Sequence, residues 1–161
     1  MSTKGLFIER AHCEVGIAAV ADAWGADGVG SDIVNMRNHN KVVFIIHWGV
    51  GATGINKFTV EACDDVSASN TTAIPFHYRQ LTAGSDPGAV TAVAVAATGF
   101  SNTAASNQVI MIEVSAEDVR ATGYQYVRCY ADETTDSPLL GGILILLLDP
   151  IFANNEQSEL T

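Results

Sequence analysis

A glycine-rich segment offers the first chemistry that the sequence could perform. Residues 49–54, Gly-Val-Gly-Ala-Thr-Gly, have the G-x-G-x-x-G spacing that lets backbone N–H groups approach a dinucleotide pyrophosphate. That chemistry also needs a helix to begin where the motif ends, because the helix N-terminus supplies free N–H groups and a favourable dipole. Residues 55–63 instead alternate with period two, which is typical of a strand. We therefore interpret the segment as a glycine-rich hairpin loop and predict no nucleotide cofactor.

Nucleophilic catalysis is the second candidate, because the chain contains serines, cysteines and four histidines. Residues 99–101, Gly-Phe-Ser, lack the second glycine of a nucleophile elbow. His47 lies inside an apolar run, which favours a neutral imidazole in a core or an interface. His77 shares a strand face with Arg79, as expected of a solvated surface. The other two histidines, His12 and His39, are too scattered to nominate a base, and we predict that the protein is not an enzyme.

Metal binding is the third candidate. Two acidic clusters could donate carboxylates to calcium, Glu61-Asp64-Asp65 and Asp132-Glu133-Asp136. Neither has the glycine-punctuated spacing of an EF-hand loop, so we interpret both as solvated acidic rims and predict no bound metal. The cysteines show no C-x-x-C pair, which favours reduced packing residues over a zinc site or a disulfide framework. They are Cys13, Cys63 and Cys129.

The elements that would position these groups are mainly strands. Residues 42–48 are apolar on both alternating faces, which predicts a central strand covered on two sides. Residues 56–63 alternate as a half-solvated strand does. A proline at position 75 places the run 73–80 at a sheet edge or at a strand start. The other predicted strands are residues 90–97, 108–114, 124–131 and 143–148.

Helix signals are few. Ser115 followed three residues later by Asp118 is a capping arrangement, and Gly123 ends any helix there within about two turns. Residues 17–24 could form a second helix. Short strands with many turns and few helical residues predict an all-β fold, an antiparallel sandwich or barrel with one short helical turn.

Composition narrows the possible partners. The 161 residues include eight basic and eighteen acidic side chains, for a net charge of −10. This charge opposes binding to phosphate backbones and to anionic lipid, so we predict neither a nucleic-acid nor a membrane partner. The apolar stretch 139–148 is about half as long as a bilayer crossing, which predicts a buried strand. The first apolar run, residues 6–8, is cut by two charged residues, so we expect no signal peptide.

Large apolar side chains are more numerous than strand alternation alone would place inside a sandwich. Aromatic residues concentrate at protein interfaces, so we expect some of them to lie between subunits. The alternative is that loops cover them within one subunit. The interface candidates are Trp24, Trp48, Tyr124, Tyr126 and Tyr130.

Four segments set the order of strands and loops: SDIVNMRNHNKVVFIIHWGVGATG, FTVEACDDV, TTAIPFHYRQLTAGSDPGAVT and NQVIMIEVSAEDVRATGYQYVRCYADETTDSPLLGGILILLLDP. In this order, over residues 30–152, the chain resembles the small structural proteins of tailed bacteriophages that decorate or cement the capsid. The resemblance brings no catalytic or binding motif with it. It implies a jelly-roll-like β-sandwich that sits as a homo-oligomer on the outside of a phage head and bridges neighbouring major capsid proteins.

These observations lead to one main hypothesis and two alternatives. We expect a non-enzymatic protein of the virion, assembled onto the capsid surface in the host cytoplasm, with residues 1–40 as an N-terminal arm and loop segment packed on the domain, residues 41–152 as the sandwich and residues 153–161 as a polar tail. The first alternative is a carbohydrate- or receptor-binding head-fibre or tail module, in which exposed tyrosines stack on a ligand. The second alternative is a hydrolase built on a β-sandwich.

Overall fold

The structure is a computed structural model and describes residues 7, 11–25, 27–51, 53–84, 92–135 and 138–151. The expected tail, residues 153–161, and most of residues 1–10 lie outside this described part. The strands and the helix are β1 (His12–Val20), β2 (Val29–Gly30), β3 (Val34–Asn35), β4 (His39–Trp48), β5 (Ile55–Cys63), β6 (Thr71–Ile74), β7 (Phe76–Thr82), β8 (Val93–Val95), β9 (Phe100–Ser101), β10 (Gln108–Ser115), α2 (Ala116–Ala121), β11 (Tyr126–Thr135) and β12 (Gly141–Pro150).

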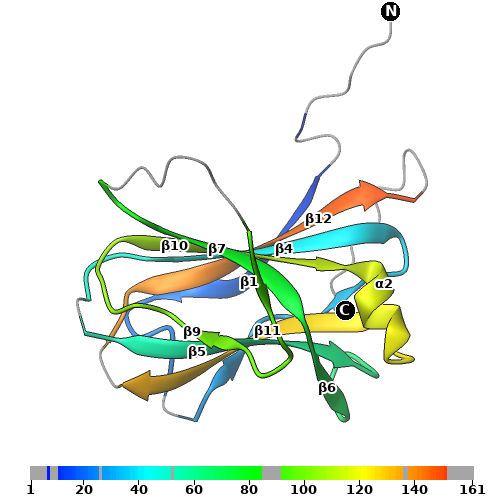
Figure 1. Ribbon diagram of the computed structural model, residues 1–161, viewed down its shortest axis with the longest axis horizontal. Coiled ribbons are helices and arrows are strands. Elements are labelled where there is room, and N and C mark those ends of the chain that lie inside the picture. The colour runs from blue at the N-terminus through cyan, green and yellow to red at the C-terminus, as the bar shows by residue number, and fades with distance from the viewer. Residues whose placement is uncertain are drawn as a thin grey trace, which may run out of the picture.

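Two antiparallel sheets pack face to face as a sandwich (Figure 1). The first, which we call sheet A, has the strand order β1-β12-β4-β10-β7-β8. The second, sheet B, has the order β2-β11-β5-β6, with β3 also paired to β11 and β9 to β5. The predicted all-β antiparallel sandwich is confirmed, and the strand order is consistent with a jelly-roll-like fold.

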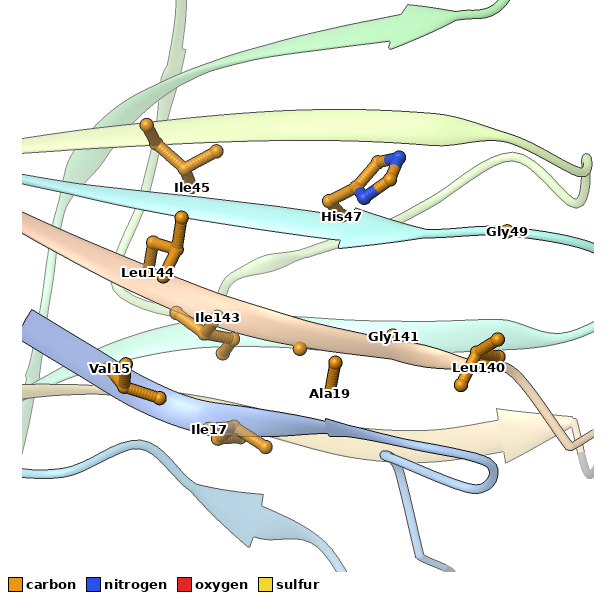
Figure 2. A pocket seen from close by; sticks show the side chains of 11 residues that line it. Val15, Ile17, Ala19, Ile45, His47, Gly49, Leu140, Gly141, Ile143 and Leu144 are labelled. Atoms are coloured by element: carbon orange, nitrogen blue, oxygen red, sulfur yellow. The ribbon is translucent and has the colours of Figure 1, made fainter.

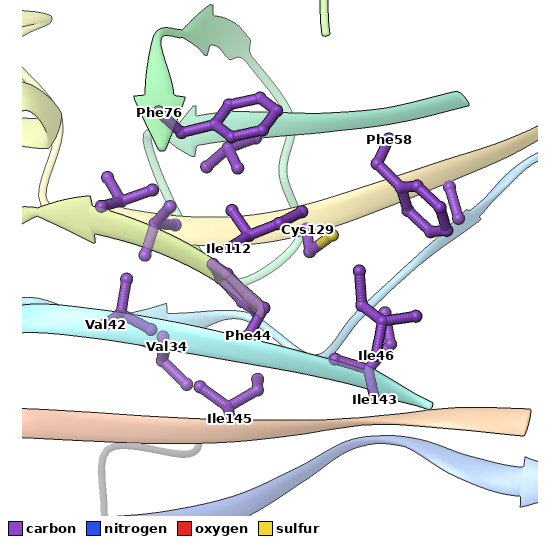
Figure 3. Close-up of a cluster of buried hydrophobic side chains, with 14 of the residues drawn as sticks. Val34, Val42, Phe44, Ile46, Phe58, Phe76, Ile112, Cys129, Ile143 and Ile145 are labelled. Atoms are coloured by element: carbon purple, nitrogen blue, oxygen red, sulfur yellow. The ribbon is translucent and has the colours of Figure 1, made fainter. Parts of the chain in front are cut away.

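The core lies between the sheets (Figure 3). Phe44 and Ile46 on β4 and Ile112 on β10 point inward from sheet A, while Phe58 on β5 and Cys129 on β11 point inward from sheet B. All five side chains are fully buried. Burying a side chain of this size contributes about 1.5–3 kcal/mol, so this layer holds the two sheets together.

Strand β4 is central in sheet A, as predicted, but only one of its faces is buried. Val42, Phe44 and Ile46 are 0% exposed, whereas Val43 and Ile45 are half-buried and His47 is exposed. The expectation of cover on both sides is wrong, because sheet A is an outer layer and no described element packs on its far side. The apolar residues on that side are therefore in contact with solvent.

Residues 12–35 belong to the sandwich instead of forming an arm. β1 is the edge strand of sheet A and pairs with β12, while β2 and β3 pair with β11 in sheet B. A Cβ at Gly16 would lie 2.8 Å from Ile145, so this glycine lets β1 approach β12 closely. The expected helix over 17–24 is wrong, since Ile17 is paired to Ile143 in the ladder. The sandwich therefore begins at His12, well before the expected boundary at residue 41.

Two loops connect the sheets in ways that local pattern did not predict. The glycine-rich segment 49–54 joins β4 in sheet A to β5 in sheet B, so it is a crossover between sheets and not a hairpin. No helix follows it, as expected. Pro75 separates β6 from β7, and the chain passes there from sheet B to sheet A. Proline suits this corner because it has no N–H to donate to either ladder.

Helix α2 confirms the predicted helical turn between β10 and β11. The Ser115 hydroxyl accepts a hydrogen bond from the Asp118 N–H at 3.1 Å, which caps the helix. The Arg120 guanidinium donates to the Met36 carbonyl at 2.8 Å and fixes the helix to the turn before β4. In the described part of the chain no helix combines the length and the hydropathy that a membrane crossing needs.

Candidate functional site

The outer face of sheet A is the candidate functional site, and β12 forms its centre. Alternate residues of β12 point inward to the core, and the others point out. The outward row consists of leucines except at one position, which is a glycine. Leu140, just before the strand, is 56% exposed and Leu144 is 44% exposed. In order, the row consists of Leu140, Gly142, Leu144, Leu146 and Leu148.

Neighbouring strands widen this row into a continuous apolar surface. Leu144 lies opposite Val15 on β1 and Ile45 on β4, and Ile45 lies opposite Met111 on β10. Directly opposed side chains in an antiparallel pair lie on the same face, close enough to touch. One row of contacts therefore crosses four strands, and the rows beside it add Leu146, Val43, Val109 and Leu81.

A groove of about 510 Å³ is hollowed into this surface along β12 (Figure 2). Val15, Ile17 and Ala19 on β1 form one wall, and Ile45 and His47 on β4 form the other. Leu140 and Leu144 mark its two ends along β12.

Glycine shapes the floor of the groove. A Cβ at Gly142 would lie 2.7 Å from the Ile17 carbonyl oxygen, and one at Gly141 would lie 2.7 Å from the His47 carbonyl oxygen. Side chains at these positions would therefore push the neighbouring strands apart. The two glycines let β1 and β4 approach β12 and leave the space above it open.

Polar side chains lie at the margin of the apolar face. The Lys41 ammonium is 3.5 Å from a Glu113 carboxylate oxygen and 3.9 Å from an Asp149 oxygen, all at one end of the sheet. Each of these side chains is about half exposed, so solvent screens the pairs and they add little stability. Arg79 and His77 on β7 lie along one side. An apolar centre with a polar margin is the usual build of a protein-binding surface.

The groove can bind a partner mainly by burying apolar surface. Among the described residues that line the groove, His47 is the only ionisable one. Within the described residues, no group of three or more histidine, cysteine or acidic side chains is placed to hold a metal ion. The outer face can therefore bind another apolar surface, with His47 as one hydrogen-bonding group beside the contact.

The two predicted tryptophan anchors are not at the surface, and this part of the interface prediction is corrected. Trp24 and Trp48 are both 0% exposed. Trp24 packs edge-on against Phe58 with ring centroids 5.9 Å apart, and the Trp48 indole N–H donates to the Ala105 carbonyl at 3.0 Å. Both rings are therefore buried within one chain and not between subunits.

The three tyrosines do not form one stripe. Tyr126 and Tyr130 lie on the outer face of β11, whereas Tyr124 precedes the strand and packs against the core. The Tyr130 hydroxyl donates to the Asp27 carbonyl at 3.1 Å, and the Arg128 guanidinium lies 5.2 Å from the Tyr130 ring centroid. All three tyrosines are half-buried. Their role at a subunit contact stays a prediction.

The acidic clusters have structural partners. Glu61 forms an ion pair with Arg128 at 2.7 Å across β5 and β11. The Asp64 carboxylate accepts hydrogen bonds from the side chain and the backbone of Asn70, which lower its pKa below the usual value. The Asp65 carboxylate accepts from the Ser67 and Ser69 N–H groups and closes the β5–β6 turn. In the second cluster, Asp136 lies outside the described residues.

Two cysteines lie in the core and one lies on the candidate face. Burial raises the pKa of the Cys63 thiol to about 11 and raises that of Cys129 further. Cys13 is exposed on β1, opposite Leu146. All three thiols are free in the structure.

Comparison of the chain with family models, with curated proteins and with solved structures gives no match. The site is therefore defined by its own geometry. The prediction that residues 139–148 form a buried strand is correct for one side of the strand only, because the alternate side chains on the other side lie on the outer face. The leucines at alternate positions from 140 to 148, interrupted only by Gly142, are the signal that could have shown it.

Proposed function

We propose that the protein is a structural component of a tailed-bacteriophage head, which binds the outside of the capsid and stabilises it by bridging major capsid proteins. The observation that supports this proposal is the wide apolar outer face of sheet A, because a large uncovered apolar face of this kind marks an interaction site. Residues 30–152 resemble capsid decoration proteins, and this resemblance is the reason for proposing a phage head as the assembly.

The chemistry of the face agrees with a structural role. Its groove is lined by aliphatic side chains and glycines, with one imidazole at the wall. Such a surface supplies binding energy mainly through the burial of apolar area. A head protein needs the same property, since its task is to hold subunits together under load.

The alternative of a carbohydrate- or receptor-binding module would use tyrosine rings as a stacking platform. Arg128 lies over the Tyr130 ring, and the Tyr130 hydroxyl is held by the loop at Asp27. A ring whose face and hydroxyl are both engaged within the chain offers little surface for a sugar. The geometry therefore favours the structural role over the binding module.

Heat-induced release of packaged DNA tests the proposal. Heads are prepared with and without the protein, heated in steps and assayed for DNA that has become sensitive to nuclease. We expect heads that lack the protein to lose DNA at a lower temperature, because bridging contacts resist rupture of the lattice. Purified protein added back should restore the higher temperature. Equal heat resistance of the two preparations would refute the proposal.

A control protein separates specific bridging from general protein effects. An equally acidic, unrelated protein of the same size, added at the same concentration, should leave the release temperature unchanged. Electron cryo-microscopy of the restored heads should also show added density on the outer surface of the capsid. Restored heat resistance without such density would contradict bridging.

A further inference from the structure

We propose that the outer face of sheet A binds a second copy of this chain, with Leu144 of each copy seated in the groove of the other. This inference rests on the proposed function and names a second copy as the partner of the face. A self-associated pair could touch several capsid subunits at once. Such multivalent contact slows dissociation even where each contact is weak.

The first argument is that β12 carries a knob and a hollow side by side. Leu144 projects from the outer face, and Gly142, two residues away on the same side of the strand, leaves the groove open. A two-fold axis that crosses β12 at right angles near Ile143 would place each Leu144 opposite the other copy's Gly142. One two-fold rotation then seats both leucines in the opposite hollows, which gives a closed pair.

The second argument is that the same axis matches the neighbouring strands. On β4 it places Ile45 opposite His47 of the other copy, because these residues flank the axis in the ladder just as Leu144 and Gly142 do. On β10 it places Met111 opposite Val109. Apolar residues of the two copies therefore meet on β12 and β10, while on β4 each Ile45 packs beside an imidazole of the other copy.

The third argument is electrostatic. Two chains of net charge −10 repel each other, so they can associate only where their acidic groups stay apart. Lys41, Glu113 and Asp149 all lie toward one end of sheet A. The two-fold axis turns that end toward the opposite end of the other copy, where β4 leads into the glycine-rich loop. The acidic groups of the two copies are thus kept apart.

The fourth argument is area. Five strands spaced about 4.8 Å apart, each about nine residues long at about 3.3 Å per residue, cover about 24 Å by 30 Å, or about 700 Å². A specific interface of standard size buries about 800 Å² on each partner. The strands concerned are β1, β12, β4, β10 and β7. This estimate includes the polar margin of the face and lies within the range of about 600–1,000 Å² that standard interfaces bury on each partner.

Sedimentation equilibrium of the full chain tests the proposal, with three variants. Leu144→Asp places a carboxylate on β12, the centre of the site, and Val15→Asp places one beside it on the edge strand β1; Leu144 is 44% and Val15 is 53% exposed in one copy. Val66→Asp is the matched control, because Val66 is 41% exposed but lies in the β5–β6 turn, away from the face. Circular dichroism melts show whether each variant is folded.

We expect the unmodified chain and Val66→Asp to sediment at twice the chain mass. Each face variant should raise the dissociation constant at least about 30-fold, equivalent to the 2 kcal/mol loss of a central anchor. A folded chain that stays monomeric at every concentration would overturn the proposal. Association that both face variants leave intact would overturn it equally.

The outcome is separable from that of the proposed function. A monomeric chain that still raises the DNA-release temperature of heads would mean that a capsid protein occupies the face, which overturns self-association and leaves the head function standing. A pair that the face variants dissociate, formed by a protein without effect on heads, would support self-association and refute the head function.

Discussion

At the scale of single residues, Gly28 shows how one missing side chain fixes a loop against sheet B. It has a φ of +74°, and a Cβ there would overlap the hydroxyl and the ring edge of Tyr130. Because that hydroxyl is hydrogen-bonded to Asp27, the ring cannot move away without breaking a contact. Gly28 therefore serves both the backbone conformation and the packing of Tyr130.

Substitution of two glycines separates these effects. Gly84 has a similar φ of +79°, but among the described residues no atom lies within 4 Å of its Cβ position. We expect Gly84→Ala to lower the free energy of unfolding by about 1–2 kcal/mol for the left-handed backbone alone. Gly28→Ala should cost about 1–3 kcal/mol more because it overpacks the tyrosine. Urea titration measures both, and equal losses would contradict the packing of Tyr130 under this loop.

Thiol reactivity distinguishes the three cysteines. Cys63 and Cys129 are fully buried, and burial raises both thiol pKa values, whereas Cys13 is exposed. At about pH 8, and at a chain concentration low enough to keep the chain monomeric, an aromatic disulfide reagent should label one thiol in the folded chain and all three after unfolding, because only accessible thiolate reacts. Rapid labelling of two or more thiols in the folded chain would show that the reagent reaches the core and would contradict the burial of Cys63 and Cys129.

The raised pKa of Cys63 also predicts a pH dependence of stability. The folded state holds this thiol protonated up to about pH 11, whereas the unfolded thiol ionises from its ordinary pKa of 9.0. Its contribution is therefore complete below pH 9.0 and is lost as the pH rises toward about 11. We expect the free energy of unfolding to fall over this range, and to fall less steeply in Cys63→Ala. Equal slopes would contradict this assignment.

At the scale of elements, β4 has two faces with different energetic roles. Its inward side chains fill the core, while its outward side chains form part of the candidate binding face. Adjacent isoleucines, Ile46 and Ile45, therefore offer a comparison in which residue type and strand are constant and only the direction of the side chain differs.

Alanine substitution of these two isoleucines tests the assignment. Ile46→Ala should lower the free energy of unfolding by about 2–5 kcal/mol, because it removes buried contacts and leaves a cavity. Ile45→Ala should cost less than about 1.5 kcal/mol in the monomer, since the side chain is already half in solvent. Chemical unfolding at low chain concentration measures both. Equal costs would mean that both faces of β4 are covered.

At the scale of the whole molecule, net charge and apolar surface act in opposite directions. The charge of −10 keeps copies apart at long range, and the outer face of sheet A attracts at contact. Added salt screens the repulsion between surface charges but acts little on buried apolar area. The response to salt therefore reports which force governs assembly.

Salt should leave the association unchanged or strengthen it. Between about 50 and 500 mM sodium chloride the Debye length falls from about 14 to about 4 Å, so the repulsion between two acidic copies weakens. We expect the dissociation constant from sedimentation, and the amount of protein bound to heads, to improve or stay constant. A loss of binding over this range would indicate an interface made of ion pairs and would contradict the apolar contact.

Local sequence pattern by itself predicted the class of fold, the helical turn and most of the strands from residue 42 onward, but not β1, where a helix was expected. Period-two alternation in residues 56–63 and the Ser115 cap act within a few residues, so they can be recognised without knowledge of the partners. The sequence also predicted that the glycines at 49–54 precede a strand. These features follow from backbone geometry and hydrogen bonding, which are local.

Only the tertiary structure decided which apolar surfaces are covered. The run 42–48 reads the same whether its second face meets another layer of this chain, another chain or water, because hydrophobicity does not specify what is placed against it. Trp24 and Trp48 became core residues because both pack against Phe58 of sheet B, and β1 joined sheet A because Gly16 lets it approach β12. The groove over Gly142 likewise exists only where three strands, separated by up to a hundred residues or more along the chain, lie side by side.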